Sequence, residues 1–97
     1  MSKEQVNHPN HYSKNGKECI DIMEEEFSSI GLLAFCILNE FKYRFRQGSK
    51  EGNPREQDAA KAEWYHNYAY KKYMALPLWK RIIINVIDPH LVTLIVR

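Results

Sequence analysis

The chain has 97 residues, of which 44% are hydrophobic and 27% charged, and its formal net charge is +2. This composition predicts one soluble globular domain rather than a disordered chain. The charge is too small for a duplex nucleic-acid binder, which usually carries a strongly basic stripe, and no uncharged run reaches the roughly 20 residues of a membrane span, so neither partner is expected.

Residues 1–17 are predicted to form an extended N-terminal arm. The segment is polar and shows no apolar periodicity, so no helix is expected there. His8, His11 and Tyr12 allow three interpretations: they pin the arm to the domain by hydrogen bonds and ring packing, they contact a bound phosphate or base, or the two histidines hold a metal with a third ligand. A histidine pair alone is a weak metal signal, which favours the first two.

Residues 18–76 are predicted to be the core, an all-α domain built on an antiparallel helical hairpin. Residues 19–27 have apolar side chains at helical spacing and predict a short first helix. Ser28 or Ser29 is expected to cap the helix that follows.

The hairpin is predicted over residues 32–73. Its first arm begins apolar on every face, which indicates a buried helix, and then a polar face carrying Asn39, Lys42 and Arg46 emerges at spacings of three and four. The second arm has a clear start, an Asn-Pro pair at residues 53–54 that suits a cap and first helical position. Because the connection is short, the two arms should be antiparallel neighbours.

The second arm is expected to face the polar side of the first. Asp58, Lys61, Ala62 and Tyr65 share one stripe of that arm, and Trp64 lies beside it. The resulting cleft would be basic and aromatic with one acid, which suits a phosphorylated, ring-containing ligand. The alternative is an ion-pair network on a solvated edge, with at least half of the aromatic side chains in the core.

The two cysteines, Cys19 and Cys36, fall among apolar residues of predicted helices. We interpret them as buried thiols in a reducing compartment, because no signal peptide is recognised. A disulfide or a reactive nucleophile is the less favoured alternative.

Residues 77–97 are predicted to form an apolar C-terminal extension. A Leu-Pro-Leu sequence at residues 76–78 breaks the second arm, a helix is favoured over a strand for residues 82–87, and residues 91–96 are β-prone. An exposed apolar end on so small a domain would aggregate, so it should pack on the hairpin or on another subunit. We therefore expect a homo-oligomer.

Four short blocks occur in order along the chain: residues 6–12 (VNHPNHY), 16–21 (GKECID), 35 with 39–43 (F, then NEFKY) and 58–65 (DAAKAEWY). Their order and spacing resemble those of a family of small tailed-phage proteins of formerly unknown function, described as nucleotide kinase-like. The resemblance implies a phage protein that works in the bacterial host cytoplasm and handles a nucleotide. It does not imply that every member is a kinase.

The predicted nucleotide-binding residues come from the arm and from both sides of the hairpin: His8, His11, Tyr12, Asn39, Lys42, Tyr43, Arg46, Lys61, Trp64 and Tyr65. Lys42, Arg46 and Lys61 would hold phosphate while one of the rings contacts the base. Phosphoryl transfer would need a different apparatus from a P-loop, because no glycine run is followed by Lys-Ser or Lys-Thr. The cofactor considered is magnesium, with Asp21 or Asp58 as its ligand.

Three functions stay open at this point. As an enzyme, the protein would be a nucleotide phosphotransferase resembling a deoxynucleoside monophosphate kinase. As a binding module, it would sequester a nucleotide or a nucleotide-derived signal, blunt a host defence and need no magnesium. As an interaction protein, it would inhibit a host protein through its apolar tail, and the cleft would be structural.

Overall fold

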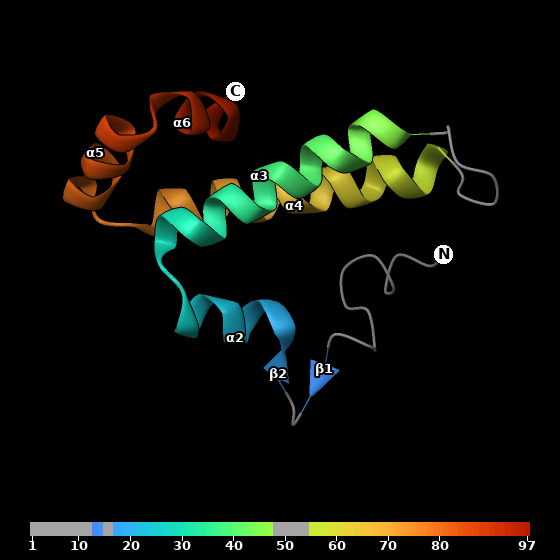
Figure 1. The fold of residues 1–97 in the computed structure, drawn as a ribbon, viewed down its shortest axis with the longest axis horizontal. Coiled ribbons are helices and arrows are strands. Elements are labelled where there is room, and N and C mark those ends of the chain that lie inside the picture. Colours follow the sequence, from blue (N-terminus) through green and yellow to red (C-terminus); the bar gives the residue numbers. More distant parts are fainter. Residues whose placement is uncertain (1–12, 15–16, 48–54) are drawn as a thin grey trace.

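The computed structural model describes residues 13–14, 17–47 and 55–97. Its fold is all-α, as predicted, and its helices are α2 (Cys19–Glu26), α3 (Ser29–Arg46), α4 (Arg55–Ala75), α5 (Leu78–Ile87) and α6 (Pro89–Val96) (Figure 1). A two-residue antiparallel pair precedes them, with β1 (Ser13–Lys14) joined to β2 (Lys17–Glu18). The predicted loop signals at Gly48 and at residues 53–54 lie outside the described residues.

Helices α3 and α4 form the predicted antiparallel hairpin and lie side by side in Figure 1. The apolar first half of α3 is buried through Leu32, Leu33 and Cys36. On α4, Ala62 and Ala69 are fully buried, and such small side chains let two helices approach closely. The hairpin therefore forms the hydrophobic core and also fixes where the polar ends of the two arms meet.

Side chains near residues 18–31 define the starts of α2 and α3. The backbone N–H of Glu18 donates to Asp21 Oδ2 over 3.3 Å in a capping box for α2. Ser28 is the N-cap of α3, and its Oγ accepts a hydrogen bond from the N–H of Gly31 over 3.1 Å. Of the two predicted capping serines, Ser28 is the one that caps.

The C-terminal extension contains two helices. The prediction of a helix over residues 82–87 is confirmed by α5, but the β-prone interpretation of residues 91–96 is wrong, because α6 covers them. Asp88 caps α6 by accepting a hydrogen bond from the N–H of Leu91 over 3.0 Å, and Pro89 occupies the first helical turn. These local start signals outweigh the weak strand preference of the β-branched residues that follow.

Helix α6 completes the core by packing on both arms of the hairpin. Leu91 and Ile95, one turn apart, are 6% and 0% exposed and belong to the same buried cluster as Leu33 and Tyr73. Part of the extension therefore packs on the hairpin, as expected. No helix of the described ranges is both long and apolar enough to span a membrane.

Candidate functional site

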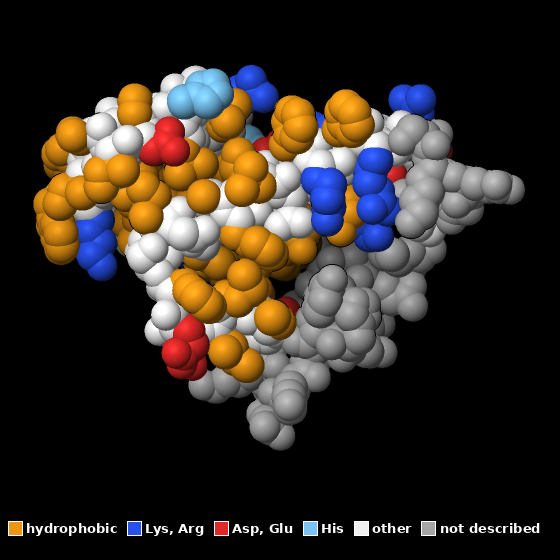
Figure 2. All heavy atoms as spheres, viewed as in Figure 1, with side chains coloured by type: hydrophobic (Ala, Val, Ile, Leu, Met, Phe, Trp, Pro, Cys, Tyr) orange, Lys and Arg blue, Asp and Glu red, His pale blue; other side chains and the backbone are white. Residues whose placement is uncertain are grey.

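Three cationic groups gather near the ring of Tyr43, toward the end of the hairpin where α3 finishes. From the ring centroid, Lys42 Nζ lies 4.5 Å away, Arg46 Cζ 5.3 Å and Lys61 Nζ 5.3 Å. Figure 2 shows Lys and Arg side chains clustered on this part of the surface. We call Lys42, Tyr43, Arg46 and Lys61 the basic cluster.

The basic cluster forms because the two arms meet in a fixed register. The rings of Tyr43 on α3 and Tyr65 on α4 stack at 6.0 Å with an interplanar angle of 10°. Tyr65 also meets Phe35 edge-on, with ring centroids 6.0 Å apart. These contacts place Lys61, one turn before Tyr65, opposite the cations of α3. The arms thus come together as the sequence predicts, while nucleotide binding by these side chains stays a prediction.

Arg46 is held by an acid inside the hairpin. Its Nε lies 3.5 Å from Asp58 Oδ1, and Asp58 is 0% exposed, whereas the Arg46 side chain is 30% exposed. A predicted alternative was an ion-pair network on a solvated edge. The ion pair is present, but its acid is buried. A buried carboxylate depends strongly on a nearby cation, so this pair fixes the position of Arg46.

The two lysines of the basic cluster differ from Arg46. Among the residues that the structure describes, no carboxylate lies within ion-pair distance of Lys42 or Lys61. Lys42 is exposed and Lys61 is half-buried. Two ammonium groups near one ring repel each other, and an anion bound between them would relieve that repulsion. The lysines are therefore the groups best suited to bind a phosphate.

Trp64, Tyr65 and Tyr68 of α4 form a packed row of rings. Trp64 meets Tyr65 edge-on at 5.1 Å and stacks with Tyr68 at 5.3 Å. Tyr65 and Tyr68 are partly buried and pack against the buried cluster, so these two rings line the hydrophobic core without belonging to it. Among the rings that the structure describes, Tyr43 is the one over which Lys42, Lys61 and Arg46 lie, and it is the first candidate for a contact with a ligand.

Asn39 and Asp21 make local contacts. Asn39 Nδ2 donates to the Phe35 carbonyl over 2.9 Å, within its own helix, and Asp21 belongs to the capping box of α2. Within the described ranges, no three His, Cys, Asp or Glu side chains lie close enough together to hold a metal. Magnesium binding by Asp21 or Asp58 therefore stays a prediction.

Three residues of the predicted site belong to the N-terminal arm. His8, His11 and Tyr12 lie outside the described residues. Their proposed contact with a phosphate or a base therefore stays a prediction, as do the pinning and metal interpretations.

An interaction that the sequence reasoning missed ties the arms together on the side of α3 away from Lys42. Glu40 Oε1 lies 2.8 Å from His66 Nδ1, and Glu40 Oε2 accepts a hydrogen bond from Arg44 Nε over 2.9 Å. The spacing of four between Glu40 and Arg44 was a usable signal. The contact with His66 depends on the register of the two helices, which the sequence does not display.

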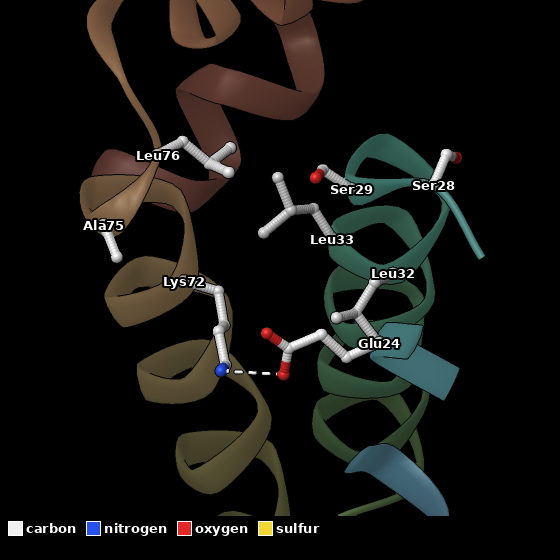
Figure 3. Close-up of a pocket in the computed structure, with 8 residues that line it drawn as sticks. All are labelled: Glu24, Ser28, Ser29, Leu32, Leu33, Lys72, Ala75 and Leu76. Carbon is white, nitrogen blue, oxygen red and sulfur yellow. Dashed lines mark ion pairs between the residues drawn. The ribbon is translucent and has the colours of Figure 1, made fainter. Parts of the chain in front are cut away.

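A pocket of about 200 Å³ lies toward the opposite end of the hairpin, between the start of α3 and the end of α4. Figure 3 shows Lys72 and Glu24 pointing toward each other beside it, and their ion pair is 2.8 Å long. Tyr68 also donates to Glu24 over 3.4 Å, and burial, followed by the Glu24 charge, raises the pKa of Tyr68. Because Lys72 is paired here, this pocket suits an anion less well than the basic cluster does.

The two cysteines differ in environment. Cys36 is fully buried, as predicted, and burial raises the pKa of its thiol from 9.0 to about 12. Cys19 is exposed, so its predicted burial is wrong. It begins α2, a short helix in which no residue is buried.

We expect a thiol-specific reagent to modify Cys19 quickly and Cys36 at least roughly 100-fold more slowly, because Cys36 must first be exposed by opening of the core. Mass spectrometry after timed labelling measures both rates, and Cys19→Ser isolates the slow one. Equal labelling rates of the two cysteines in the folded protein would contradict this assignment.

Since folding raises the pKa of Cys36, the contribution of this thiol to stability should be complete below pH 9 and lost as the pH rises toward 12.

The fold and the basic cluster together define a small all-α protein with a cationic, aromatic site on a helical hairpin. A family model described as "Protein of unknown function (DUF3310)" matches residues 6–67, and the chain belongs to this family. No curated protein and no solved structure matches significantly. The basic cluster lies within the matched residues, whereas α5 and α6 lie beyond them.

Proposed function

We propose that this protein binds a nucleotide at the basic cluster. Lys42 and Lys61 would contact the phosphate and the ring of Tyr43 would contact the base or sugar. The observation that carries this proposal is the gathering of two lysines and one arginine within 6 Å of one ring, against one carboxylate, Asp58, in the described part of the site.

The free energies of the contacts favour an exchange when a phosphate binds: the lysines would leave the ring of Tyr43 and contact the phosphate. A cation near an exposed aromatic ring contributes about 0.5–1 kcal/mol. A hydrogen bond to a charged group contributes about 1.5–3 kcal/mol. A phosphate would therefore draw the ammonium groups of Lys42 and Lys61 away from the ring of Tyr43, which would open part of that ring to a base.

Binding without turnover is the simpler form of the proposal. Asp58 is buried against Arg46, and Asp21 Oδ2 accepts the capping hydrogen bond of α2, so each carboxylate already has a structural role in the described structure. A protein that sequesters a nucleotide or a nucleotide-derived signal needs only the cationic and aromatic contacts. A phosphotransferase resembling a deoxynucleoside monophosphate kinase is the second form, supported by the resemblance of the four sequence blocks.

The biological setting is also a proposal. The order and spacing of those blocks resemble small tailed-phage proteins, which supports an accessory protein acting in the cytoplasm of a bacterial host. There, sequestering a nucleotide signal would blunt a host defence. Direct inhibition of a host defence protein is the alternative if no nucleotide binds.

We expect Lys42→Ala and Lys61→Ala each to weaken nucleotide binding by about 1.5–3 kcal/mol, or roughly 10- to 150-fold, because each removes a charge-assisted contact to phosphate. Calorimetric titration of mononucleotides and cyclic nucleotides into wild type and variants measures the loss. Lys71→Ala, an exposed lysine on α4, is the matched control and should bind like wild type.

Magnesium distinguishes the two forms of the proposal. A sequestering protein should bind with similar affinity in the presence and absence of the metal. A kinase that is given ATP as phosphoryl donor and a nucleoside monophosphate as acceptor should need the metal and release ADP and a nucleoside diphosphate. If no nucleotide binds wild type, or if both lysine variants bind as tightly as wild type, the site is wrong and the host-protein inhibitor takes its place.

A further inference from the structure

Helix α5 presents an apolar face to solvent. Its large apolar side chains are 47–77% exposed, and they are Leu78, Trp79, Ile82, Ile83, Val86 and Ile87. One α5 residue, Ile84, is buried. Figure 2 shows hydrophobic side chains gathered over α5 at the left end of the molecule. We call the six exposed side chains the α5 face.

The α5 face is one continuous stripe. Trp79, Ile82, Ile83 and Val86 recur at spacings of three and four, which places them on one side of the helix. The opposite side meets the rest of the chain through Ile84 and through Arg81, whose Nε donates to the Leu76 carbonyl over 3.2 Å. The apolar stripe of an amphipathic helix normally packs on the core of its own domain. The stripe of α5 is exposed instead, which is typical of a helix that packs on another molecule.

We propose that the α5 face is the contact surface between two copies of this chain. Its exposed fractions correspond to roughly 700 Å² of apolar surface, and a standard protein interface buries about 800 Å² per partner. The α5 face of a second copy has the same length and the same apolar character, and a two-fold interface uses the same surface on both subunits. Lys80 and Asp88 lie at the margin of the α5 face, as in an apolar interface with a polar rim.

Charge favours one orientation of the two helices. Lys80 lies near the start of α5, and the exposed Asp88 directly follows its end. In an antiparallel pair, with the two-fold axis near Ile82 and Ile83, Lys80 of each copy lies toward Asp88 of the other. A parallel pair would place like charges together at both ends, which is unfavourable. The dimer is therefore antiparallel about the middle of α5.

This interface is independent of the proposed nucleotide site. Residues 78–87 lie beyond the family match at residues 6–67. They also lie at the opposite end of the hairpin from the end of α3, where the basic cluster lies (Figure 1). Failure of one proposal therefore leaves the other standing.

Point substitutions test the interface better than truncation, because removing residues 77–97 would also remove the core residues Ile84, Leu91 and Ile95. We expect wild type to sediment at twice the chain mass of 11.5 kDa and Val86→Asp to sediment as a monomer, with association roughly 100-fold weaker. Val86 is 77% exposed, so the variant should keep the circular dichroism of wild type.

Leu38→Asp is the matched control. Leu38 is an aliphatic residue on α3 that is 68% exposed, and this variant should remain a dimer. The proposal is overturned if wild type is a monomer at 100-micromolar-scale concentrations, or if Leu38→Asp dissociates the dimer while Val86→Asp does not. Binding of monomeric wild type to anionic phospholipid vesicles, lost in Val86→Asp, would overturn it in favour of a membrane surface.

Disulfide formation tests the orientation in a Cys19→Ser background. Ile82→Cys, near the two-fold axis, should form a dimer-linking disulfide readily under mild oxidation. Val86→Cys should form it at least tenfold more slowly, because antiparallel packing separates the two copies of residue 86 by about 10 Å along the helices. Equal rates for the two variants would overturn the antiparallel arrangement.

Discussion

Replacing Ile95 with alanine is expected to lower the free energy of unfolding by about 3 kcal/mol. Ile95 is 0% exposed and packs in the cluster formed by the hairpin and α6. Alanine would remove buried methyl and methylene groups and leave a cavity, and both effects weaken the core. Ile95→Val should cost about 1 kcal/mol, because it removes a single methylene group.

Urea denaturation followed by circular dichroism measures these losses. Val96→Ala is the matched control, because Val96 is the next residue of the same helix and is 48% exposed. It should change the free energy of unfolding by less than about 0.5 kcal/mol. If Ile95→Ala were as mild as Val96→Ala, α6 would be an appendage of the hairpin rather than a part of its core.

Most of the helical architecture could be predicted because its determinants are local. The apolar first half of α3 and the break at residues 76–78 are visible in the sequence. Ser28 is a recognisable cap. Burial of the first arm on several sides also indicated that another element must pack on it, and both α4 and α6 do so.

The interpretation of residues 91–96 failed although the necessary signal was present. Their β-branched composition suggested a strand, and the Asp-Pro pair at residues 88–89 was interpreted only as a break. Asp88 instead caps α6 and Pro89 begins it, the same arrangement that was predicted from the Asn-Pro pair at residues 53–54. The Asp-Pro pair therefore ends α5 and begins α6 at the same place.

That the basic side chains of the two arms come together was predictable, but the geometry of their arrangement was less so. Helical spacing placed Lys42 and Arg46 on one face, and the short connection brought Lys61 opposite them. The rotation of α4 about its own axis decides which of its side chains turn inward, and no local pattern reports that angle. The complete burial of Asp58 and the contact of His66 with Glu40 follow from that rotation, so they became visible only in the structure.

Replacing Arg46 with alanine is expected to lower the free energy of unfolding by about 3 kcal/mol, because it takes away the cation that faces a fully buried carboxylate. Arg44→Ala is the matched control on the same helix. Arg44 pairs with Glu40 over 2.9 Å, but its side chain is 51% exposed, so that loss should be about 0–1 kcal/mol. Urea denaturation of the two variants measures the difference.

A double-mutant cycle identifies the origin of the Arg46 effect. If the loss comes from the interaction with Asp58, then Arg46→Ala in an Asp58→Ala background should cost at least about 1 kcal/mol less than in wild type. Equal costs in the two backgrounds would mean that Arg46 stabilises the hairpin through its other contacts, such as the one with the ring of Tyr43, rather than through the pair with Asp58.

The result also decides what part Arg46 would have in the proposed nucleotide binding. A cation held by a buried acid can raise the local potential without leaving its position, so Lys42 and Lys61 would supply the direct phosphate contacts. If Arg46→Ala instead destabilises no more than Arg44→Ala, the pair with Asp58 holds Arg46 only weakly. Arg46 would then be available to a phosphate on the same terms as the two lysines.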